Sequence, residues 1–214
     1  MRDARLRRTV LASAIVVAAG GASLYQGTGG LHVFTSEQAR RISIARAPRP
    51  VPQVTLEDQF GRTFSFSDYR GRPLLVDFVY TRCTTVCPLL SGAFMRLQHR
   101  TDSAGRLAML SITFDPADGR SRLQAYADHN HAGHGWRMAR VRDSRDLARV
   151  LSAFGIVVIA DTNGEFQHNA ALHVVDVAGR LSRVLDVDAT ADDVLGAASV
   201  MTKARPPRVR GAVR

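Results

Sequence analysis

The sequence is poor in cysteine, with two cysteines in 214 residues. A structural zinc site takes four protein ligands, often several cysteines among them, so a single pair argues against that kind of site. Internal repeats are missing as well. A chain of this length without repeats is expected to form one domain of ordinary size with tails, and it is long enough to bury a sizeable core.

The central part of the sequence also lacks a concentrated basic region, although the formal net charge is +10. Residues 1–8 and 31–50 each carry +3, residues 201–214 carry +5, and the body at 51–200 carries about −1. The body has no basic motif interleaved with aromatic residues, so we expect no nucleic-acid partner. Basic ends favour contact with anionic lipid head groups instead.

No uncharged apolar stretch reaches the ~20 residues of a comfortable transmembrane helix. The nearest is residues 9–25, rich in Val, Ile, Leu and Ala, which follows four arginines at Arg2, Arg5, Arg7 and Arg8. This order is typical of an export signal, so residues 1–25 are expected to be a signal or membrane-anchor segment. Several small residues at 18–23 leave cleavage and retention both open. A buried N-terminal helix of the domain fits less well, because the segment is apolar all round.

In either case the positive end stays in the cytoplasm and the rest of the chain is exported. We therefore predict an extracytoplasmic protein in the periplasm, tethered to the inner membrane by its N-terminal segment. Residues 26–50 are expected to form the tether, with a short helix from about Ser36 to Ile44 and an extended, proline-rich stretch at 47–52.

The two cysteines, Cys83 and Cys87, stand four residues apart between an apolar strand pattern at 73–79 and a helical pattern that begins after Pro88. In a helical turn, side chains at this spacing face the same way, with β-carbons roughly 5–6 Å apart. Two thiols placed like this either close a disulfide or hold one metal ion. The start of a helix also lowers a thiol pKa. A purely structural disulfide across so short a loop would stabilise little, so redox or metal chemistry is the better interpretation.

Strand and helix patterns alternate through the rest of the body. The expected strands are 54–56, 63–66, 73–80, 107–114, 138–141, 171–176 and 181–185, and the expected helices are 88–99, 121–128, 145–154 and 191–201. The first two strands should pair across a turn at 58–62, and the last two across Gly179. This alternation predicts an α/β layer fold over residues 51–203, followed by a basic, disordered tail at 204–214.

Three motifs carry a resemblance to a known family. They are DFVYTRCTTVCP at 77–88, TFDP at 113–116, and His168 leading into VVDVAG at 174–179. Over residues 51–203 the chain resembles the Sco/SenC family, which has a thioredoxin-like fold, here with an N-terminal hairpin extension. The resemblance implies that Cys83, Cys87 and His168 ligate copper.

The resemblance also implies a function: a copper-binding assembly factor, with no catalytic turnover, that delivers copper to the binuclear centre of cytochrome c oxidase. The expected partner is the copper-bearing subunit of that oxidase. Three departures from the family pattern concern neighbours of the ligands. Thr84 replaces a proline, Gln167 replaces an acidic residue before His168, and Asp118 comes one position earlier than the usual second acid after Asp115.

The chemistry of the three ligands agrees with this implication. Soft thiolates select Cu(I) and an imidazole also suits Cu(II), so the set could hold either oxidation state. Both sulfurs must be reduced to bind the metal, and a disulfide between Cys83 and Cys87 would abolish the site. Extracytoplasmic compartments form disulfides readily, so a thiol reductant protein is expected as a second partner.

The other histidines are weaker candidates. His173 lies inside an apolar strand pattern, which favours a packed or edge position. His129, His131 and His134 belong to a glycine-containing stretch, for which a solvated loop is the better interpretation than a metal site.

Two enzymatic alternatives remain. The first is a thiol-disulfide oxidoreductase, in which Cys83 and Cys87 would be redox-active. Against it, the spacer holds three residues, and residues 167–169 lack the proline that usually faces the thiols in thioredoxin-type enzymes. The second is a peroxiredoxin-like peroxidase using Cys87, which fits less well because Tyr80 stands where that motif has a proline.

Overall fold

The structure is a computed structural model that describes residues 2–27, 35–85, 87–101, 107–162 and 165–202. The chain divides into two compact units, residues 1–43 and 44–214, which are described separately. The predicted tail at 204–214 and part of the predicted tether, residues 28–34, lie outside the described residues.

The first unit contains helix α1 (Arg2–Gly27) and most of helix α2 (Ser36–Arg46). Residues Arg7–Gly27 of α1 have a mean hydropathy of 1.5 in their most apolar window, and their side chains are exposed. By length and composition this helix could cross a membrane, as a signal sequence near an N-terminus also could. In α2, Glu37 pairs with Arg40 and Arg41 one turn ahead, at 2.7 and 3.0 Å.

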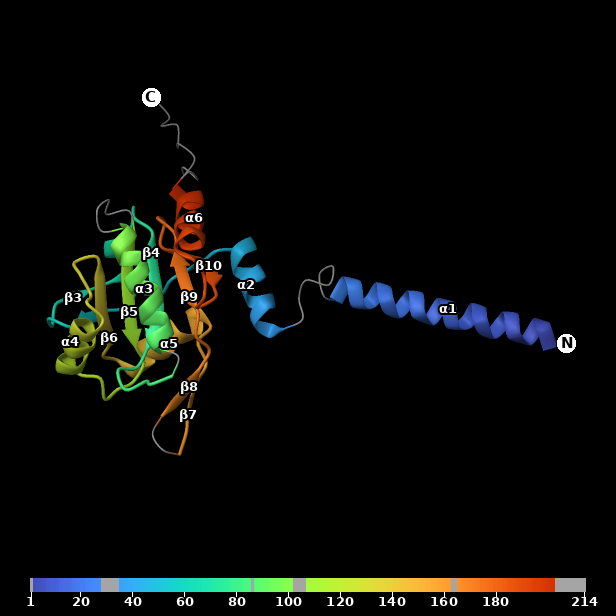
Figure 1. The fold of residues 1–214 in the computed structure, drawn as a ribbon, viewed down its shortest axis with the longest axis horizontal. Coiled ribbons are helices and arrows are strands. Elements are labelled where there is room, and N and C mark those ends of the chain that lie inside the picture. Colours follow the sequence, from blue (N-terminus) through green and yellow to red (C-terminus); the bar gives the residue numbers. More distant parts are fainter. Residues whose placement is uncertain (1, 28–34, 86, 102–106, 163–164, 203–214) are drawn as a thin grey trace, which may run out of the picture. The chain divides into compact units, whose positions relative to one another are not determined.

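The second unit is built on an eight-stranded mixed sheet with the order β1-β10-β9-β4-β5-β6-β2-β3 (Figure 1). The strands are β1 (Arg49–Pro50), β2 (Leu56–Asp58), β3 (Thr63–Phe64), β4 (Leu74–Val79), β5 (Ala108–Thr113), β6 (Trp136–Val141), β9 (Leu172–Val175) and β10 (Arg180–Leu185). A separate antiparallel hairpin is formed by β7 (Val158–Ala160) and β8 (Phe166–His168). The helices are η1 (Phe66–Tyr69), α3 (Cys87–Thr101), α4 (Arg120–His129), α5 (Ser144–Phe154) and α6 (Ala191–Thr202).

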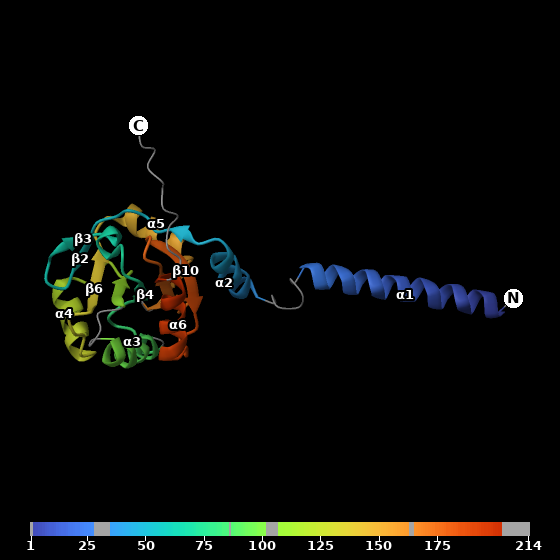
Figure 2. The ribbon, with the colours of Figure 1, turned by 90° about the horizontal axis from the view of Figure 1, so that it is seen from above.

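The three central strands β4, β5 and β6 run parallel and are joined by α3 and α4. Every residue of β4 and β5 is buried, as expected for parallel strands covered on both faces. Figures 1 and 2 show α3, α4 and α6 on one face of the sheet and α5 on the other. The turn between β4 and α3, which carries the cysteines, therefore lies at the carboxyl edge of the parallel strands, where α/β sheets commonly place their sites.

The core on the α5 face explains the position of one histidine. The rings of Phe78 and Phe154 pack edge-on against His173, with ring centroids 5.7 and 5.5 Å apart. His173 is fully buried in β9, so the prediction of a packed position is confirmed. Gly155, which directly follows the last residue of α5, has φ 68° and forms a left-handed cap that ends the helix.

Most predicted elements are found, and the α/β layer fold is confirmed. The hairpin of β2 and β3 closes across a turn in which Asp58 Oδ1 accepts hydrogen bonds from the backbone N–H groups of Phe60 and Arg62, both at 2.9 Å. The stretch predicted as an extended linker differs in one respect. Its residues Arg49 and Pro50 form β1, which pairs with the outer edge of β10.

The β7–β8 hairpin was not predicted. It matters for the site because His168 is its last residue, opposite Val158. Each strand has three residues, and none of the six is fully buried, so neither the length nor the apolar alternation that identifies a strand is present.

Candidate metal centre

The two cysteines lie in a tight turn between β4 and α3. The backbone N–H of Cys83 donates to the carbonyl oxygen of Tyr80 at 3.1 Å. The backbone N–H of Cys87, the first residue of α3, donates to Cys83 Sγ at 3.4 Å, and Thr85 Oγ1 lies 3.7 Å from the same sulfur. Both thiols are free; Cys83 is 8% exposed and Cys87 is completely buried. The predicted strand-to-helix position of the pair is confirmed.

The surroundings give the two thiols different pKa values. Burial opposes ionisation of Cys83, but hydrogen bonds from Cys87 and from Thr85 outweigh it and lower the pKa of Cys83 to about 7. Burial raises the pKa of Cys87 far above its usual value, and the hydrogen bond to Cys83 raises it further. Cys83 is therefore the thiolate near neutral pH. This order disfavours the peroxidase interpretation, which needs Cys87 as the nucleophile.

An acid lies close enough to the pair to affect it. Asp77, in β4, is 1% exposed, and burial raises the pKa of its carboxyl group to about 7. Its charge contributes to the raised pKa values of Cys87 and of Tyr126. The residue was noted in the sequence only as part of a motif. The signal that could have identified it is a lone acid inside an otherwise apolar parallel strand.

A second buried acid holds the cysteine turn in place. Asp118 accepts hydrogen bonds from the backbone N–H of Thr81 at 2.8 Å and from its hydroxyl at 2.5 Å. It also accepts one from the hydroxyl of Thr113, at the end of β5, at 2.6 Å. Although Asp118 comes one position earlier in the sequence than the usual second acid, it still contacts the cysteine turn. Its hydrogen bonds link Thr81, which precedes Cys83, to the neighbouring strand β5.

The third predicted ligand, His168, lies in an aromatic cluster. Its ring packs against Phe114 with centroids 4.9 Å apart, and Phe114 in turn contacts Tyr80 and Phe166. Both ring nitrogens of His168 are buried and have no hydrogen-bond partner within the part of the chain that the structure describes. Burial lowers the pKa of His168, so the imidazole is neutral near pH 7 and has a lone pair available for a metal ion.

The structure brings the two thiols together but leaves His168 apart from them. Among the described residues, no three His, Cys, Asp or Glu side chains are close enough together to hold a metal ion. Joint ligation by Cys83, Cys87 and His168 thus stays a prediction, and it requires the cysteine turn or the β7–β8 hairpin to shift. The donors fit a soft metal in kind, because buried imidazole nitrogens without partners and a free thiol pair are what such an ion would take.

The histidines at the end of α4 and just after it form no metal-binding set among the described residues. His129, His131 and His134 are all exposed; His131 and His134 lie in the expected solvated loop, whereas His129 is the last residue of α4. His131 has φ 52°, and its carbonyl oxygen accepts a hydrogen bond from the side chain of Gln98 at 2.9 Å.

Several solved structures with the same fold are those of Sco proteins. The structure of Bradyrhizobium japonicum ScoI with copper bound superposes with a TM-score of 0.58 at 20% identity, over 69% of this chain and 97% of that one. BsSco, described as a member of the Sco family of cytochrome c oxidase assembly proteins with a disulfide switch, superposes with a TM-score of 0.64 at 20% identity, over 74% of this chain and 96% of that one. These likenesses confirm the predicted thioredoxin-like fold.

Sequence comparison gives the same answer. A protein of Stutzerimonas stutzeri, whose name describes it as copper-binding, is 29% identical over 152 residues, which are 68% of this chain and 72% of that protein. The model of the family described as SCO1/SenC matches residues 45–202, and the chain therefore belongs to the SCO1/SenC family.

Proposed function

We propose that this protein is a copper metallochaperone that binds copper through Cys83, Cys87 and His168 and delivers it to the copper-bearing subunit of cytochrome c oxidase. The observation that supports it best is the combination of a free thiol pair at the start of α3 with a buried imidazole whose nitrogens have no partner within the described residues. The copper-binding Stutzerimonas relative and the copper-bound ScoI structure support copper as the cargo.

The two thiols would contribute differently to loading. Cys83 is ionised to a large extent near pH 7 and can make the first bond to the ion, because its pKa is about 7. Cys87 carries its proton at that pH and must release it when it becomes a ligand. His168 is already neutral and needs no deprotonation, only access to the ion. Two thiolates and one imidazole suit Cu(I), and they tolerate Cu(II).

The compartment follows from the N-terminal segment. With α1 as a retained anchor or as a cleaved signal, the domain would face the periplasm, where thiol pairs oxidise. Loading would then depend on a thiol reductant protein that restores both sulfurs before copper arrives. BsSco, with its disulfide switch, supports a redox-controlled state of this kind.

The test is copper stoichiometry of the reduced full-length protein in a neutral detergent. One copper ion per chain is expected. Cys83→Ser or Cys87→Ser should abolish tight binding, and His168→Ala should weaken it and change the Cu(II) spectrum. His134→Ala, which removes an exposed loop histidine, is the matched control and should bind like the wild type. Stoichiometric tight binding by the Cys83→Ser, Cys87→Ser double variant would refute the assignment.

A second function, thiol-disulfide oxidoreductase, is favoured by the asymmetry of the thiol pair. A slightly exposed thiol with a pKa of about 7, beside a fully buried thiol of raised pKa, resembles the division between an attacking and a resolving thiol. Such an enzyme would keep the cysteines of the oxidase copper site reduced. The separation between Cys83 and His168 in this structure is compatible with this role, which needs no third ligand.

A further inference from the structure

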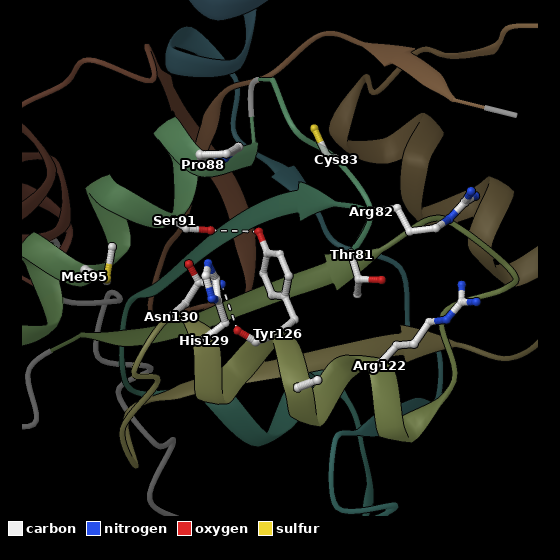
Figure 3. Close-up of a pocket in the computed structure, with 11 residues that line it drawn as sticks. Thr81, Arg82, Cys83, Pro88, Ser91, Met95, Arg122, Tyr126, His129 and Asn130 are labelled. Atoms are coloured by element: carbon white, nitrogen blue, oxygen red, sulfur yellow. Dashed lines mark hydrogen bonds between the residues drawn. The ribbon is translucent and has the colours of Figure 1, made fainter. Parts of the chain in front are cut away.

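A cavity of about 590 Å³ opens between α3 and α4, next to the cysteine turn (Figure 3). The residues that line it are Thr81, Arg82, Cys83, Pro88, Ser91, Met95, Arg122, Ala125, Tyr126, His129 and Asn130. Cys83 is the one predicted copper ligand among them; Cys87 and His168 do not line it. A molecule in this cavity would therefore contact Cys83 without contacting Cys87 or His168.

The charge of the cavity is one-sided. Among its described lining residues Arg82 and Arg122 are cationic, and none is an acid. Their side chains are 47% and 49% exposed. The carboxylates that accompany them are hidden: Asp115, 2.9 Å from Arg82, has a side chain 3% exposed, and that of Asp118, 3.9 Å from Arg122, is completely buried. An incoming molecule therefore contacts the guanidinium groups directly, while Asp115 and Asp118 lie beneath them and offset part of their charge.

The shape suits a length of polypeptide. In Figure 3 the two arginines stand at one end of the cavity and Met95 at the other, with Cys83 at the rim. The hydroxyls of Tyr126 and Ser91 lie 2.8 Å apart and bond across the space between the two helices. The apolar part of the cavity lining is formed by Pro88, Met95 and Ala125. A volume of this size is in the range of clefts that bind ligands, and this one combines apolar wall with a few fixed polar groups.

We propose that this cavity is a docking groove for an extended, acidic, cysteine-bearing segment of a partner protein, and that Arg82 and Arg122 select it. The proposal rests on the proposed function only in that both the thiol reductant and the copper recipient must bring a cysteine to Cys83. The test below distinguishes binding of an acidic segment from binding of an uncharged or a basic segment in the same groove.

Reduction of the oxidised protein would proceed in two balanced exchanges. A thiolate of the docked segment attacks Cys83 Sγ in the Cys83–Cys87 disulfide, a new partner–Cys83 disulfide forms, and the electron pair of the broken bond leaves with Cys87, which takes up a proton. A second thiol of the partner then attacks the first partner sulfur and releases Cys83 as a thiolate. The partner dithiol is oxidised to a disulfide, and it supplies both electrons.

The probe is a set of synthetic peptides Gly-X-Cys-X-Gly, with X as Glu, Gln or Lys, whose cysteine is linked by a disulfide to thionitrobenzoate. In the full-length Cys87→Ser variant, the Cys83 thiolate attacks the peptide sulfur, forms a stable mixed disulfide and expels thionitrobenzoate, whose absorbance gives the rate. Dividing each rate by that of 2-mercaptoethanol with the same peptide removes the intrinsic reactivity of the peptide.

After this correction the Glu peptide should react faster than the Lys peptide by roughly tenfold at low salt, since each exposed charge pair changes the rate by a few-fold at most. The preference should shrink as salt screens it. When Arg82→Gln and Arg122→Gln are added to the Cys87→Ser variant, the ratio of the Glu-peptide rate to the Lys-peptide rate should fall towards one. The Gln peptide should keep its rate, which would show that the Cys83 thiol itself is intact.

Arg180→Gln is the matched control. Arg180 is also a half-exposed arginine, 2.9 Å from a buried carboxylate, Asp176, but it is the first residue of β10 and does not line the cavity, so the charge preference should persist without it. A corrected ratio near one, a preference for the Lys peptide, or a Glu preference unchanged in the double arginine variant would each overturn the proposal. Copper stoichiometry of the arginine variants, measured separately, distinguishes a failure of docking from a failure of the copper function.

Discussion

The backbone N–H of Cys87 is directed at the sulfur of Cys83, 3.4 Å away. N–H groups in the first turn of a helix have no partner within the helix, and this one is used to stabilise negative charge on the neighbouring thiol. The residue that supplies this N–H keeps its own thiol buried and protonated. The start of α3 thus makes two chemically similar side chains unequal.

We therefore expect Cys83 to be alkylated by iodoacetamide much faster than Cys87 in the reduced full-length protein. The rate should rise with a midpoint near pH 7, because the thiolate reacts and its pKa is about 7. Peptide mapping by mass spectrometry after short exposures identifies the modified cysteine. Faster labelling of Cys87 would show that the assignment of the two thiols is reversed.

Replacing Asp77 by Asn should change how stability depends on pH. The pKa of Asp77 is about 7 in the folded protein, against an ordinary value of 3.8, so between these pH values the folded state holds a proton that the unfolded state releases. The wild type should accordingly lose stability as the pH rises from about 4 to 7, by up to roughly 4 kcal/mol. Urea unfolding measures the free energy of unfolding at each pH across this range. The decrease of that free energy with pH should be smaller in Asp77→Asn and unchanged in Asp128→Asn, a control at an exposed position. Equal slopes in the wild type and Asp77→Asn would contradict the burial argument.

Asp118→Ala should loosen the cysteine turn. The change removes the acceptor of three hydrogen bonds from Thr81 and Thr113, and leaving buried donors unsatisfied costs about 1–3 kcal/mol. We expect a lower free energy of unfolding together with weaker copper binding. Asp146→Ala removes an acid from an exposed ion pair on α5 and should affect neither measurement appreciably. If Asp118→Ala bound copper with the affinity of the wild type, the hydrogen bonds of Asp118 would not matter for the metal site.

Copper and oxidation should compete for the same two sulfurs. One equivalent of Cu(I) added to the reduced protein should protect both thiols from alkylation, and prior formation of the disulfide should block loading. In an insulin-reduction assay, turnover should stay well below that of a thioredoxin. Turnover comparable to a thioredoxin, with thiols unprotected by Cu(I), would favour the oxidoreductase function instead.

Residues 1–50 fused to a reporter that is active only after export should give activity. Basic residues ahead of an apolar helix long enough to cross a membrane are the physical reason. Replacing Val10, Leu11 and Ile15 by Asp should abolish the activity. If the fusion were active only with a cytoplasmic reporter, the compartment and the expected need for a reductant would both be wrong.

Sequence patterns were sufficient where structure is local. Strands β4 and β5 are continuous apolar runs, and the cysteine pair falls where a strand pattern changes to a helix pattern. The separation of His168 from the thiols could not be predicted in this way. The ring of His168 packs on Phe114, a contact between residues 54 positions apart that no local pattern encodes. Likewise, Pro48 and Pro50 led to the prediction of an extended linker. Arg49 and Pro50 instead form the edge strand β1, a position in which proline is tolerated.

Strand β1 has a practical consequence. By pairing Arg49 and Pro50 with Leu181 and Arg180 it covers part of the outer backbone of β10, and Pro50 has no N–H to offer a further strand. Open strand edges invite pairing with another chain. A fragment cut at residue 51, where the sequence patterns place the start of the domain, would expose that edge and be prone to self-association, whereas a fragment starting before α2 would keep the edge covered.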